Sequence, residues 1–286
     1  MNQPRTLLLT GAAGGIGTFL RTSLPGYGYT LRLADLKPVE GPDGAGSLVF
    51  DLADADAVRA AVRGVDAVVH LGGISLEDRF EAVLEANVRG TYHLYEAVRT
   101  EGVRRVVFAS SNHAVGYVPL GGEAPIGSAI PTRPDTYYGL SKAFGENLAS
   151  LYADKYGVET VSIRIGSCFA EPRTVRMLAT WLSPADCARL VHAALTAPGV
   201  GHTVVNGISA NTRAWWDLAA ARALGYEPRD DAEVYAQALL AAHGDPGPDH
   251  VDARYVGGSF TLTDPHHRPS PARGHAPQVT GRLFTP

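Results

Sequence analysis

Short apolar runs alternate with amphipathic stretches along the first two-thirds of the chain. A continuous apolar run is typical of a parallel strand that is buried on both faces. The intervening stretches carry the apolar spacing or the terminal signals of helices, at residues 16–24, 54–63, 79–100 and 138–156. Strands that alternate with helices predict an α/β fold, a doubly wound parallel sheet of the Rossmann type. We expect its strands at residues 6–10, 29–34, 47–50, 67–71, 105–110 and 160–165.

The pattern loosens after residue 165. Residues 183–195 fit a helix that Ser183 caps, with Pro184 at its first position, and residues 202–206 are a candidate strand. From residue 264 the chain is rich in Pro, His, Arg and Gly, which predicts a poorly ordered tail.

Composition excludes several classes of function. Hydrophobic residues make up 45% and charged residues 19% of the chain, as in ordinary globular proteins. The net charge of −4 offers no basic surface to nucleic acid. No stretch approaches the roughly 18 apolar residues of a membrane helix, and the first apolar run is too short for a secretory signal. Two cysteines, Cys168 and Cys187, cannot form a disulfide framework, so we expect a cytoplasmic protein. Because the charge is weakly negative and no long apolar run is present, we expect no membrane and no nucleic-acid partner.

A glycine-rich turn, GAAGGIG, joins the first predicted strand to the first predicted helix. Glycines permit a tight turn, and the N–H groups of the helix N-terminus can bind a pyrophosphate. Such a turn alone is weak evidence, but here a strand precedes it, a helix follows it and an acid ends the next strand. The residues expected to hold a dinucleotide are Gly11, Gly14, Gly15, Ile16 and Gly17.

Asp35, at the end of the second predicted strand, indicates which dinucleotide binds. A carboxylate there accepts hydrogen bonds from both hydroxyls of the adenine ribose and repels a 2′-phosphate, so we expect NAD rather than NADP. Arg32 and Lys37 are close enough in sequence to weaken that exclusion. Asp51, followed by Leu52, is a candidate partner for the adenine, although the same segment also fits an ordinary helix N-cap.

Tyr138 and Lys142 lie four residues apart and therefore share one face of a helix. The pKa of a free phenol, about 10, is too high for an efficient base at neutral pH. A lysine one turn away, together with the positive nicotinamide ring, is expected to lower that pKa. Tyrosinate would then take a proton from a substrate hydroxyl while hydride leaves the same carbon for NAD. The alternative is that the two residues have no catalytic role, and that a half-buried tyrosine lies beside a solvated lysine.

Ser110 and Ser111 end the fifth predicted strand, at the edge where a doubly wound sheet binds its ligands. One hydroxyl there would orient the substrate oxygen beside the tyrosine. We assign that catalytic role to Ser111 and place Ser110 at the cofactor.

Together these motifs resemble the extended short-chain dehydrogenase/reductase family, also known as NAD-dependent epimerases and dehydratases. GAAGGIG, the acid at position 35, ASSN and YGLSK follow the family's order, and the resemblance extends to about residue 263. Residues 87–91, NVRGT, match the family's segment on the helix after the fourth strand. Besides Tyr138 and Lys142, the resemblance implies cofactor contacts at Leu71, Gly72, Asn87 and Ile165.

Five segments narrow this resemblance to bacterial members that oxidise a hexuronate: HLGGIS, ASSNHAVGY, YGLSKAFGENLA, RIGSC and RMLATW. Such members oxidise C1 of D-glucuronate or D-galacturonate to an aldarolactone and form NADH. By this resemblance the substrate contacts fall on Ser75, Ser111, Asn112, His113, Ser167 and Arg176.

Arg176 is the expected partner of the uronate carboxylate, because a guanidinium can bind it in a bidentate fork; the alternative is a solvated surface arginine. Asn112 and His113 offer hydrogen bonds to sugar hydroxyls, whereas His70, inside an apolar run, is expected to be structural. The histidines at 266–267 lack partners at ligand spacing, and hydride transfer needs no metal, so we expect none.

The nearest alternative function is that of a nucleotide-sugar epimerase or dehydratase. Such enzymes carry a larger C-terminal region than the 121 residues that follow residue 165 here. A non-catalytic NAD sensor is a second alternative, and it would lack the tyrosine or the lysine. We expect an NAD-binding core with the catalytic residues at 1–165, an interleaved substrate-binding region at 166–263 and a tail at 264–286. We also expect a homo-oligomer of open subunit number. The apolar helices at 79–100 and 138–156 are candidate pairing surfaces, although burial inside one subunit would give the same pattern.

Overall fold

A seven-stranded parallel sheet forms the centre of the computed structural model, which describes residues 5–41, 44–122 and 125–264. The strand order is β3-β2-β1-β4-β5-β6-β9, so the order reverses between β1 and β4. A doubly wound sheet opens its ligand crevice at such a reversal, at the carboxyl ends of the strands. The predicted fold class is therefore confirmed. The strands are β1 (Thr6–Thr10), β2 (Thr30–Asp35), β3 (Leu48–Val49), β4 (Ala67–His70), β5 (Arg105–Ser111), β6 (Glu159–Ile165) and β9 (His202–Gly207).

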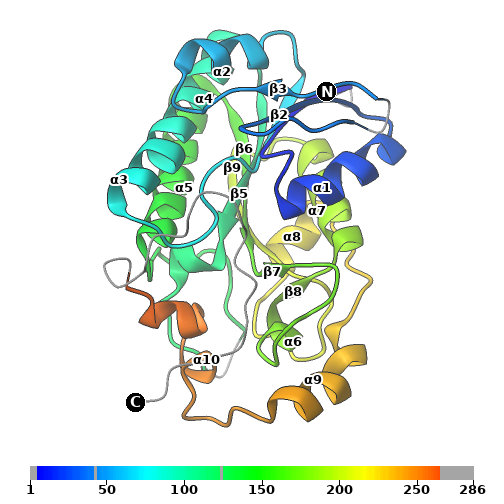
Figure 1. Cartoon of the computed structure of the whole chain (residues 1–286), viewed down its shortest axis with the longest axis vertical. Coiled ribbons are helices and arrows are strands. Elements are labelled where there is room, and N and C mark those ends of the chain that lie inside the picture. The colour runs from blue at the N-terminus through cyan, green and yellow to red at the C-terminus, as the bar shows by residue number, and fades with distance from the viewer. Residues whose placement is uncertain (1–4, 42–43, 123–124, 265–286) are drawn as a thin grey trace.

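Helices cover both faces of the sheet, which explains why its strands are apolar throughout (Figure 1). Leu7 and Leu9 of β1 pack on one face with Leu20 and Leu190, while Leu8 packs on the opposite face with Leu94, and all are fully buried. Parallel strands covered on both sides need apolar side chains in both directions. The first face carries α1 (Gly15–Ser23) and α7 (Pro184–Thr196), and the second carries α2 (Ala55–Val62), α4 (Gly90–Thr100) and α5 (Tyr137–Tyr156).

The prediction of one continuous α-helix at residues 79–100 is wrong, because its middle is a π-helical turn. The segment divides into α3 (Phe80–Val83), the π-helical turn η2 (Leu84–Arg89) and α4. A π turn holds one residue more than an α turn and leaves the apolar periodicity on either side nearly intact, so the pattern conceals it. The wider turn contains Asn87, whose side chain holds the loop after β4.

Several short elements that the sequence analysis did not identify gather at one end of the molecule (Figure 1). Since β7 directly follows β6, this is the carboxyl end of the sheet. A small core of Leu178, Trp181 and Leu239 holds part of this region together. These elements are η3 (Asn112–Val115), β7 (Ser167–Cys168), α6 (Met177–Thr180), β8 (Trp181–Leu182), η4 (Ala232–Tyr235), α9 (Ala236–His243), α10 (Val251–Arg254) and η5 (Gly258–Leu262). Two further short helices lie elsewhere: η1 (Leu24–Tyr27) joins α1 to β2, and α8 (Ala219–Ala223) packs beside β9.

The chain beyond residue 165 contributes to the sheet as well as to this end region. The predicted helix and strand after residue 165 are confirmed as α7 and β9, and β9 extends the sheet beside β6. The division of roles at residue 165 stays a prediction. Residues 265–286 of the predicted tail lie outside the described residues. Among the described helices, none is long and apolar enough to cross a membrane.

Candidate active site

The glycine-rich turn between β1 and α1 packs closely against neighbouring backbone and is open to space at Gly15. Gly11 has a φ of 72°, and a Cβ on it would lie 2.8 Å from the Gly72 nitrogen. A Cβ on Gly17 would lie 2.2 Å from the Gly11 oxygen, whereas Gly15 faces open space. In the described chain no side chain caps α1, which begins after Gly14. A helix N-terminus that opens onto free space fits a pyrophosphate.

Asp35 is fixed beside this turn by two backbone groups. Its Oδ2 accepts from the Ala13 N–H at 2.9 Å, and its Oδ1 accepts from the Lys37 N–H at 3.1 Å. Each carboxylate oxygen keeps a further lone pair for a ribose hydroxyl. Arg32 is directed elsewhere, because its Nη1 donates to the carbonyl of Ala61 at 2.8 Å. Its guanidinium is thus held by carbonyl groups at the C-terminal end of α2.

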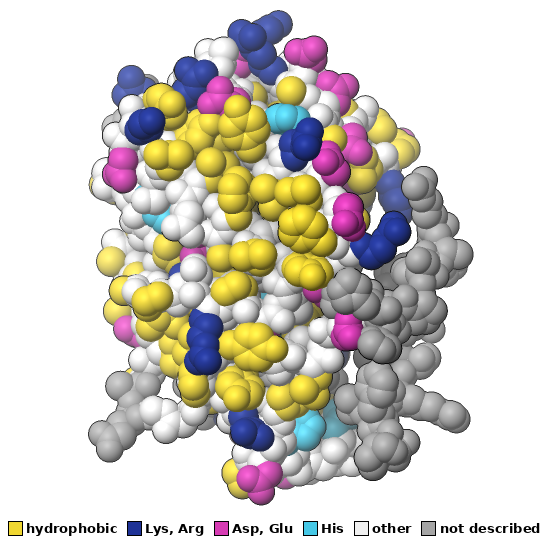
Figure 2. Space-filling model, turned by 90° about the vertical axis from the view of Figure 1, so that its left-hand side faces the viewer, with side chains coloured by type: hydrophobic (Ala, Val, Ile, Leu, Met, Phe, Trp, Pro, Cys, Tyr) yellow, Lys and Arg dark blue, Asp and Glu magenta, His cyan; other side chains and the backbone are white. Residues whose placement is uncertain are grey.

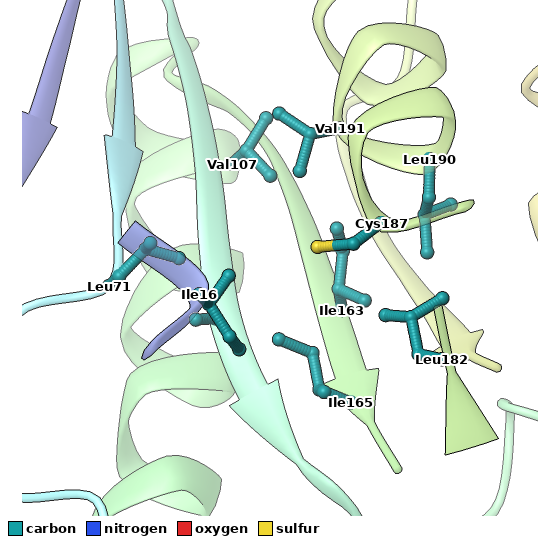
Figure 3. A pocket seen from close by; sticks show the side chains of 10 residues that line it. Ile16, Leu71, Val107, Ile163, Ile165, Leu182, Cys187, Leu190 and Val191 are labelled. Atoms are coloured by element: carbon teal, nitrogen blue, oxygen red, sulfur yellow. The ribbon is translucent and has the colours of Figure 1, made fainter. Parts of the chain in front are cut away.

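An apolar pocket connects the turn with the middle of the sheet (Figure 3). It brings together Ile16, Leu71 and Ile165, three of the residues predicted to contact the cofactor. Cys187 and Leu190 close it from α7. The residues in and around the turn therefore fit a dinucleotide: free N–H groups for the pyrophosphate, a carboxylate for the ribose and an apolar wall for a flat ring.

Tyr138 and Lys142 of α5 lie at the same edge, and both are almost fully buried. The Tyr138 hydroxyl is hydrogen-bonded to the hydroxyl of Ser111. Lys142 Nζ lies over the Tyr138 ring, 5.5 Å from its centroid, and over the Phe108 ring at 5.2 Å. The structure thus brings together the three residues predicted to be catalytic, and it excludes the alternative of a solvated lysine.

Burial dominates the acid–base properties of this pair. It raises the pKa of Tyr138 to about 12, although the hydrogen bond from Ser111 opposes the shift. Burial also lowers the pKa of Lys142 to about 8, so its charged form still predominates at neutral pH. The expected lowering of the tyrosine pKa is therefore absent in the chain by itself. A further positive charge next to the phenol is needed to favour tyrosinate.

The two serines at the end of β5 point to opposite faces of the sheet, as adjacent strand residues do. Ser111 bonds Tyr138, whereas Ser110 Oγ donates to Glu146 Oε1 at 2.5 Å. Glu146 in turn pairs with the buried Arg164 at 2.8 Å. The Ser110 side chain thus belongs to a buried polar cluster. The predicted contact of Ser110 with the cofactor would therefore have to involve its backbone atoms.

Asn112 links Ser111 to Arg176. With the amide oriented so that both its ends are satisfied, the nitrogen donates to Ser111 Oγ at 3.3 Å and the oxygen accepts from Arg176 Nη2 at 3.2 Å. Arg176 also donates to the carbonyl of Val256, and its guanidinium lies 6.0 Å from the Trp215 ring centroid. Among the described residues, no carboxylate forms a salt bridge with it, and its Nε has no hydrogen-bond partner. Asp252 and Asp135 act on the guanidinium through their charge without an ion pair, so its N–H groups keep capacity for an anionic ligand.

Two carboxylates that the sequence analysis missed hold the ends of this site. Glu77 is buried and accepts from the backbone N–H groups of Tyr137 at 3.0 Å and Tyr138 at 2.8 Å, at the N-terminus of α5. Asp135 lies 2.8 Å from His113 Nδ1. Neither residue belongs to a recognisable motif, because each acts on groups that are distant in sequence or on backbone atoms.

Asn87 and Leu52, two other residues predicted to contact the cofactor, pack against the loop after β4. Asn87 accepts from the Ile74 N–H at 2.7 Å and donates to the Ile74 carbonyl and to Ser141 Oγ, each at 2.9 Å. It thereby ties this loop to α5. Leu52 lies against Gly72, since a Cβ there would come within 2.9 Å of Leu52 Cδ1. Asn87 and Leu52 therefore shape the loop that carries two of the predicted cofactor contacts.

Three further candidates have no hydrogen bond to Tyr138 among the described residues. Ser75 is exposed on the loop after β4, and Ser167 Oγ is bonded to Thr180 Oγ1 at 3.0 Å. Within the described residues, no hydrogen bond joins either serine to Tyr138. Asp51 Oδ1 accepts from the Ala53 N–H at 2.9 Å, in a turn before α2, whose N-cap is Asp54. Their ligand contacts stay predictions.

His70 is structural, as predicted. Its ring bonds Thr10 at 2.8 Å and Thr91 at 3.3 Å, and burial lowers its pKa to about 3. Among the described residues, no group of three His, Cys, Asp or Glu side chains is placed to hold a metal ion.

A Rossmann-type sheet with a glycine-rich turn and a buried tyrosine–lysine pair at its carboxyl edge defines the class of short-chain dehydrogenases/reductases. The chain belongs to the NAD dependent epimerase/dehydratase family, whose model matches residues 7–218.

Particular members of this class are similar over nearly their whole length. A uronate dehydrogenase from Pseudomonas putida is 49% identical over 91% of this chain and 96% of its own. A crystal structure of a variant uronate dehydrogenase from Agrobacterium tumefaciens, complexed with NAD, is 46% identical over 91% of this chain and 98% of its own, with a TM-score of 0.86. A glucuronic acid dehydrogenase from Chromohalobacter salexigens is 44% identical over 93% of this chain and all of its own, with a TM-score of 0.88.

Proposed function

We propose that this chain oxidises a hexuronate, D-glucuronate or D-galacturonate, at C1 to the aldarolactone with NAD as the hydride acceptor. One observation carries the proposal: a buried phenol and an inward-facing guanidinium are joined in one cluster through Ser111 and Asn112. The phenol can accept a proton, and the guanidinium can bind a carboxylate. A uronate presents both an anomeric hydroxyl and a carboxylate to such a site.

Each residue has a distinct part in the reaction. Arg176 binds the carboxylate and so sets the position of the sugar ring. Ser111 donates to the anomeric oxygen, and Tyr138 Oη takes the proton of the anomeric hydroxyl. Lys142 stabilises the phenolate by its charge and by its place over the ring. Bound NAD, held by the glycine turn and Asp35, accepts the hydride from C1 and adds the positive charge that the buried phenol requires.

The alternative of a nucleotide-sugar epimerase or dehydratase is not favoured. The match to the Pseudomonas putida uronate dehydrogenase covers 91% of this chain and 96% of that enzyme, so it extends well beyond β6. An inward-facing arginine also has a purpose when the substrate is a free uronic acid.

A spectrophotometric assay separates these functions. The purified chain is mixed with NAD and, in separate reactions, with glucuronate, galacturonate, glucose and UDP-glucose, and NADH formation is followed. We expect turnover with one or both uronates and little with glucose. Turnover with UDP-glucose alone would contradict the proposal.

Replacing Asp35 with alanine is expected to relax the preference for NAD. The substitution removes the charge that repels a 2′-phosphate and the acceptor for the ribose hydroxyls. We expect the ratio of kcat/KM for NAD over NADP to fall by about tenfold or more, which corresponds to about 1.4 kcal/mol. Asp51→Ala, which removes a carboxylate from the turn between β3 and α2, is the control and should leave the ratio largely unchanged. An unchanged ratio in the Asp35 variant would contradict this role.

We also propose that the protein is a homo-oligomer. Hydrophobic side chains gather on the face formed by α3, α4 and α5 (Figure 2). The large apolar residues exposed there include Phe80, Tyr92, Leu140, Leu151 and Tyr156. Contiguous exposed apolar surface is typical of an interface. Light scattering is expected to give more than one subunit, and Leu151→Arg is expected to lower that number; a wild-type monomer would contradict the proposal.

The cytoplasm is the proposed location of the enzyme. Cys168 and Cys187 are both buried free thiols, and they are hydrogen-bonded to each other. Adjacent thiols that remain reduced suit a reducing compartment.

A further inference from the structure

Asp135 is a buried carboxylate that precedes Thr136, the N-cap of α5, and none of its side chain is exposed. Its Oδ2 lies 2.8 Å from His113 Nδ1. Its Oδ1 accepts from the hydroxyl of Thr136 at 3.0 Å. That hydroxyl accepts in turn from the Gly139 N–H at 2.9 Å, so its own proton is directed to Asp135. Both oxygens of the carboxylate therefore act as acceptors with defined partners.

Three glycines from separate segments close around this carboxylate. A Cβ on Gly116 would lie 2.0 Å from Asp135 Oδ2, and one on Gly257 would lie 1.8 Å from the same atom. A Cβ on Gly139 would lie 3.0 Å from Oδ1. The site therefore accommodates a side chain of this size and shape in one position. It joins η3, the start of α5 and the segment before η5.

The far side of the His113 ring is open. Phe260 stacks on the ring with centroids 4.2 Å apart, and Tyr138 lies at 5.9 Å in an edge-on arrangement. Among the described residues, Nε2 has no hydrogen-bond partner, and it is not one of the atoms closed off from solvent without a partner. The ring thus has one nitrogen held by Asp135 and the other left for a ligand beside the proposed base.

We propose that Asp135 is a positioning residue that fixes His113 as the Nδ1–H tautomer, so that Nε2 accepts a hydrogen bond from a substrate hydroxyl. An ionised carboxylate only accepts hydrogen bonds, so the proton between the two residues belongs to Nδ1. In the neutral imidazole, Nε2 then carries a lone pair. The site consequently selects a free hydroxyl at that position of the sugar and disfavours an ether oxygen, which has no proton to donate. This inference rests on the proposed function.

Asp135→Asn tests the proposal, because asparagine fits the same glycine-lined space. If Oδ1 stays with the Thr136 hydroxyl, the amide NH₂ faces Nδ1 and donates to it, which imposes the opposite tautomer. We expect KM for the uronate to rise about tenfold or more, with a smaller change in kcat and unchanged NAD affinity. Tyr29→Phe is the matched control, since it removes a hydroxyl bonded at 2.7 Å to the remote His192.

Nitrogen-15 NMR of the histidine-labelled protein reads the tautomer directly, with His113→Ala to assign the signal. We expect Nδ1–H in the wild type and Nε2–H in Asp135→Asn; Nε2–H in the wild type would overturn the proposal. A series of mono-O-methyl uronates gives the second readout. The wild type should reject one of them, and the Asn variant should reject it less. Equal losses on every substrate would mean a merely structural role. Absence of turnover with any uronate would contradict the proposed function, while the NMR result would still test the tautomer.

Discussion

Tyr138→Phe is expected to lower kcat by about 10³-fold with the uronate substrate while leaving NAD affinity nearly unchanged. General base catalysis by a positioned side chain contributes on the order of 10²–10⁴ in rate. The phenylalanine ring preserves the packing beneath Lys142 and removes only the oxygen that bonds Ser111. The rate is measured from NADH formation, and the affinity is measured by titration calorimetry.

The neighbouring tyrosine provides a matched control for that experiment. Tyr137 also begins α5, but its ring packs edge-on against Phe80, with centroids 5.4 Å apart. Tyr137→Phe should therefore retain most of the wild-type kcat. A Tyr138→Phe enzyme that kept a tenth of the wild-type rate would show that another group removes the proton.

Much of the fold was predictable because its signals are local. The runs TLLLT and RVVFAS are apolar on both faces, and a parallel sheet covered by helices requires that pattern. The glycine turn was equally predictable from a short segment. Neighbouring backbone approaches Gly11 and Gly17 too closely for any side chain, so the turn requires glycine at these positions. Such features need only short segments of chain to be recognised.

The missed features depend on contacts between distant segments. Asp135 acts on His113, 22 positions away, and Gly257 from the far end of the chain lies against its carboxylate. Glu77 caps α5 from 61 positions before Tyr138. No periodicity or local motif encodes such pairings. The short strands β7 and β8, each two residues long, are likewise too brief to produce a pattern.

The choice between Ser110 and Ser111 depends partly on a local pattern and partly on a contact with a distant segment. Strand alternation requires that adjacent serines face opposite sides, but the sequence does not tell which side faces the tyrosine. The structure resolves it through Glu146, which takes Ser110 into a buried cluster with Arg164. Because Glu146 binds the Ser110 hydroxyl, Ser111 is the serine whose hydroxyl is available beside Tyr138.

Arg176→Ala is expected to raise KM for glucuronate by about 100-fold, which corresponds to about 2.7 kcal/mol. The guanidinium supplies the positive charge opposite the carboxylate, and truncating one partner of a largely desolvated charge pair costs 2–5 kcal/mol, about that range. Burial lowers the pKa of Arg176, but a guanidinium stays charged at neutral pH. Arg176→Lys keeps a charge without the bidentate fork and should recover only part of the loss.

A comparison of substrates distinguishes carboxylate binding from a loss of structure. Arg176 also donates to the Val256 carbonyl and to Asn112, so its removal disturbs the protein as well as the ligand. Glucose lacks the carboxylate, and its slow oxidation should therefore change much less in Arg176→Ala than that of glucuronate. Arg173→Ala is the control, since that exposed side chain lies over the Phe169 ring at 4.1 Å and should alter neither reaction. Equal losses on glucose and glucuronate would show that Arg176 supports the site without binding the carboxylate.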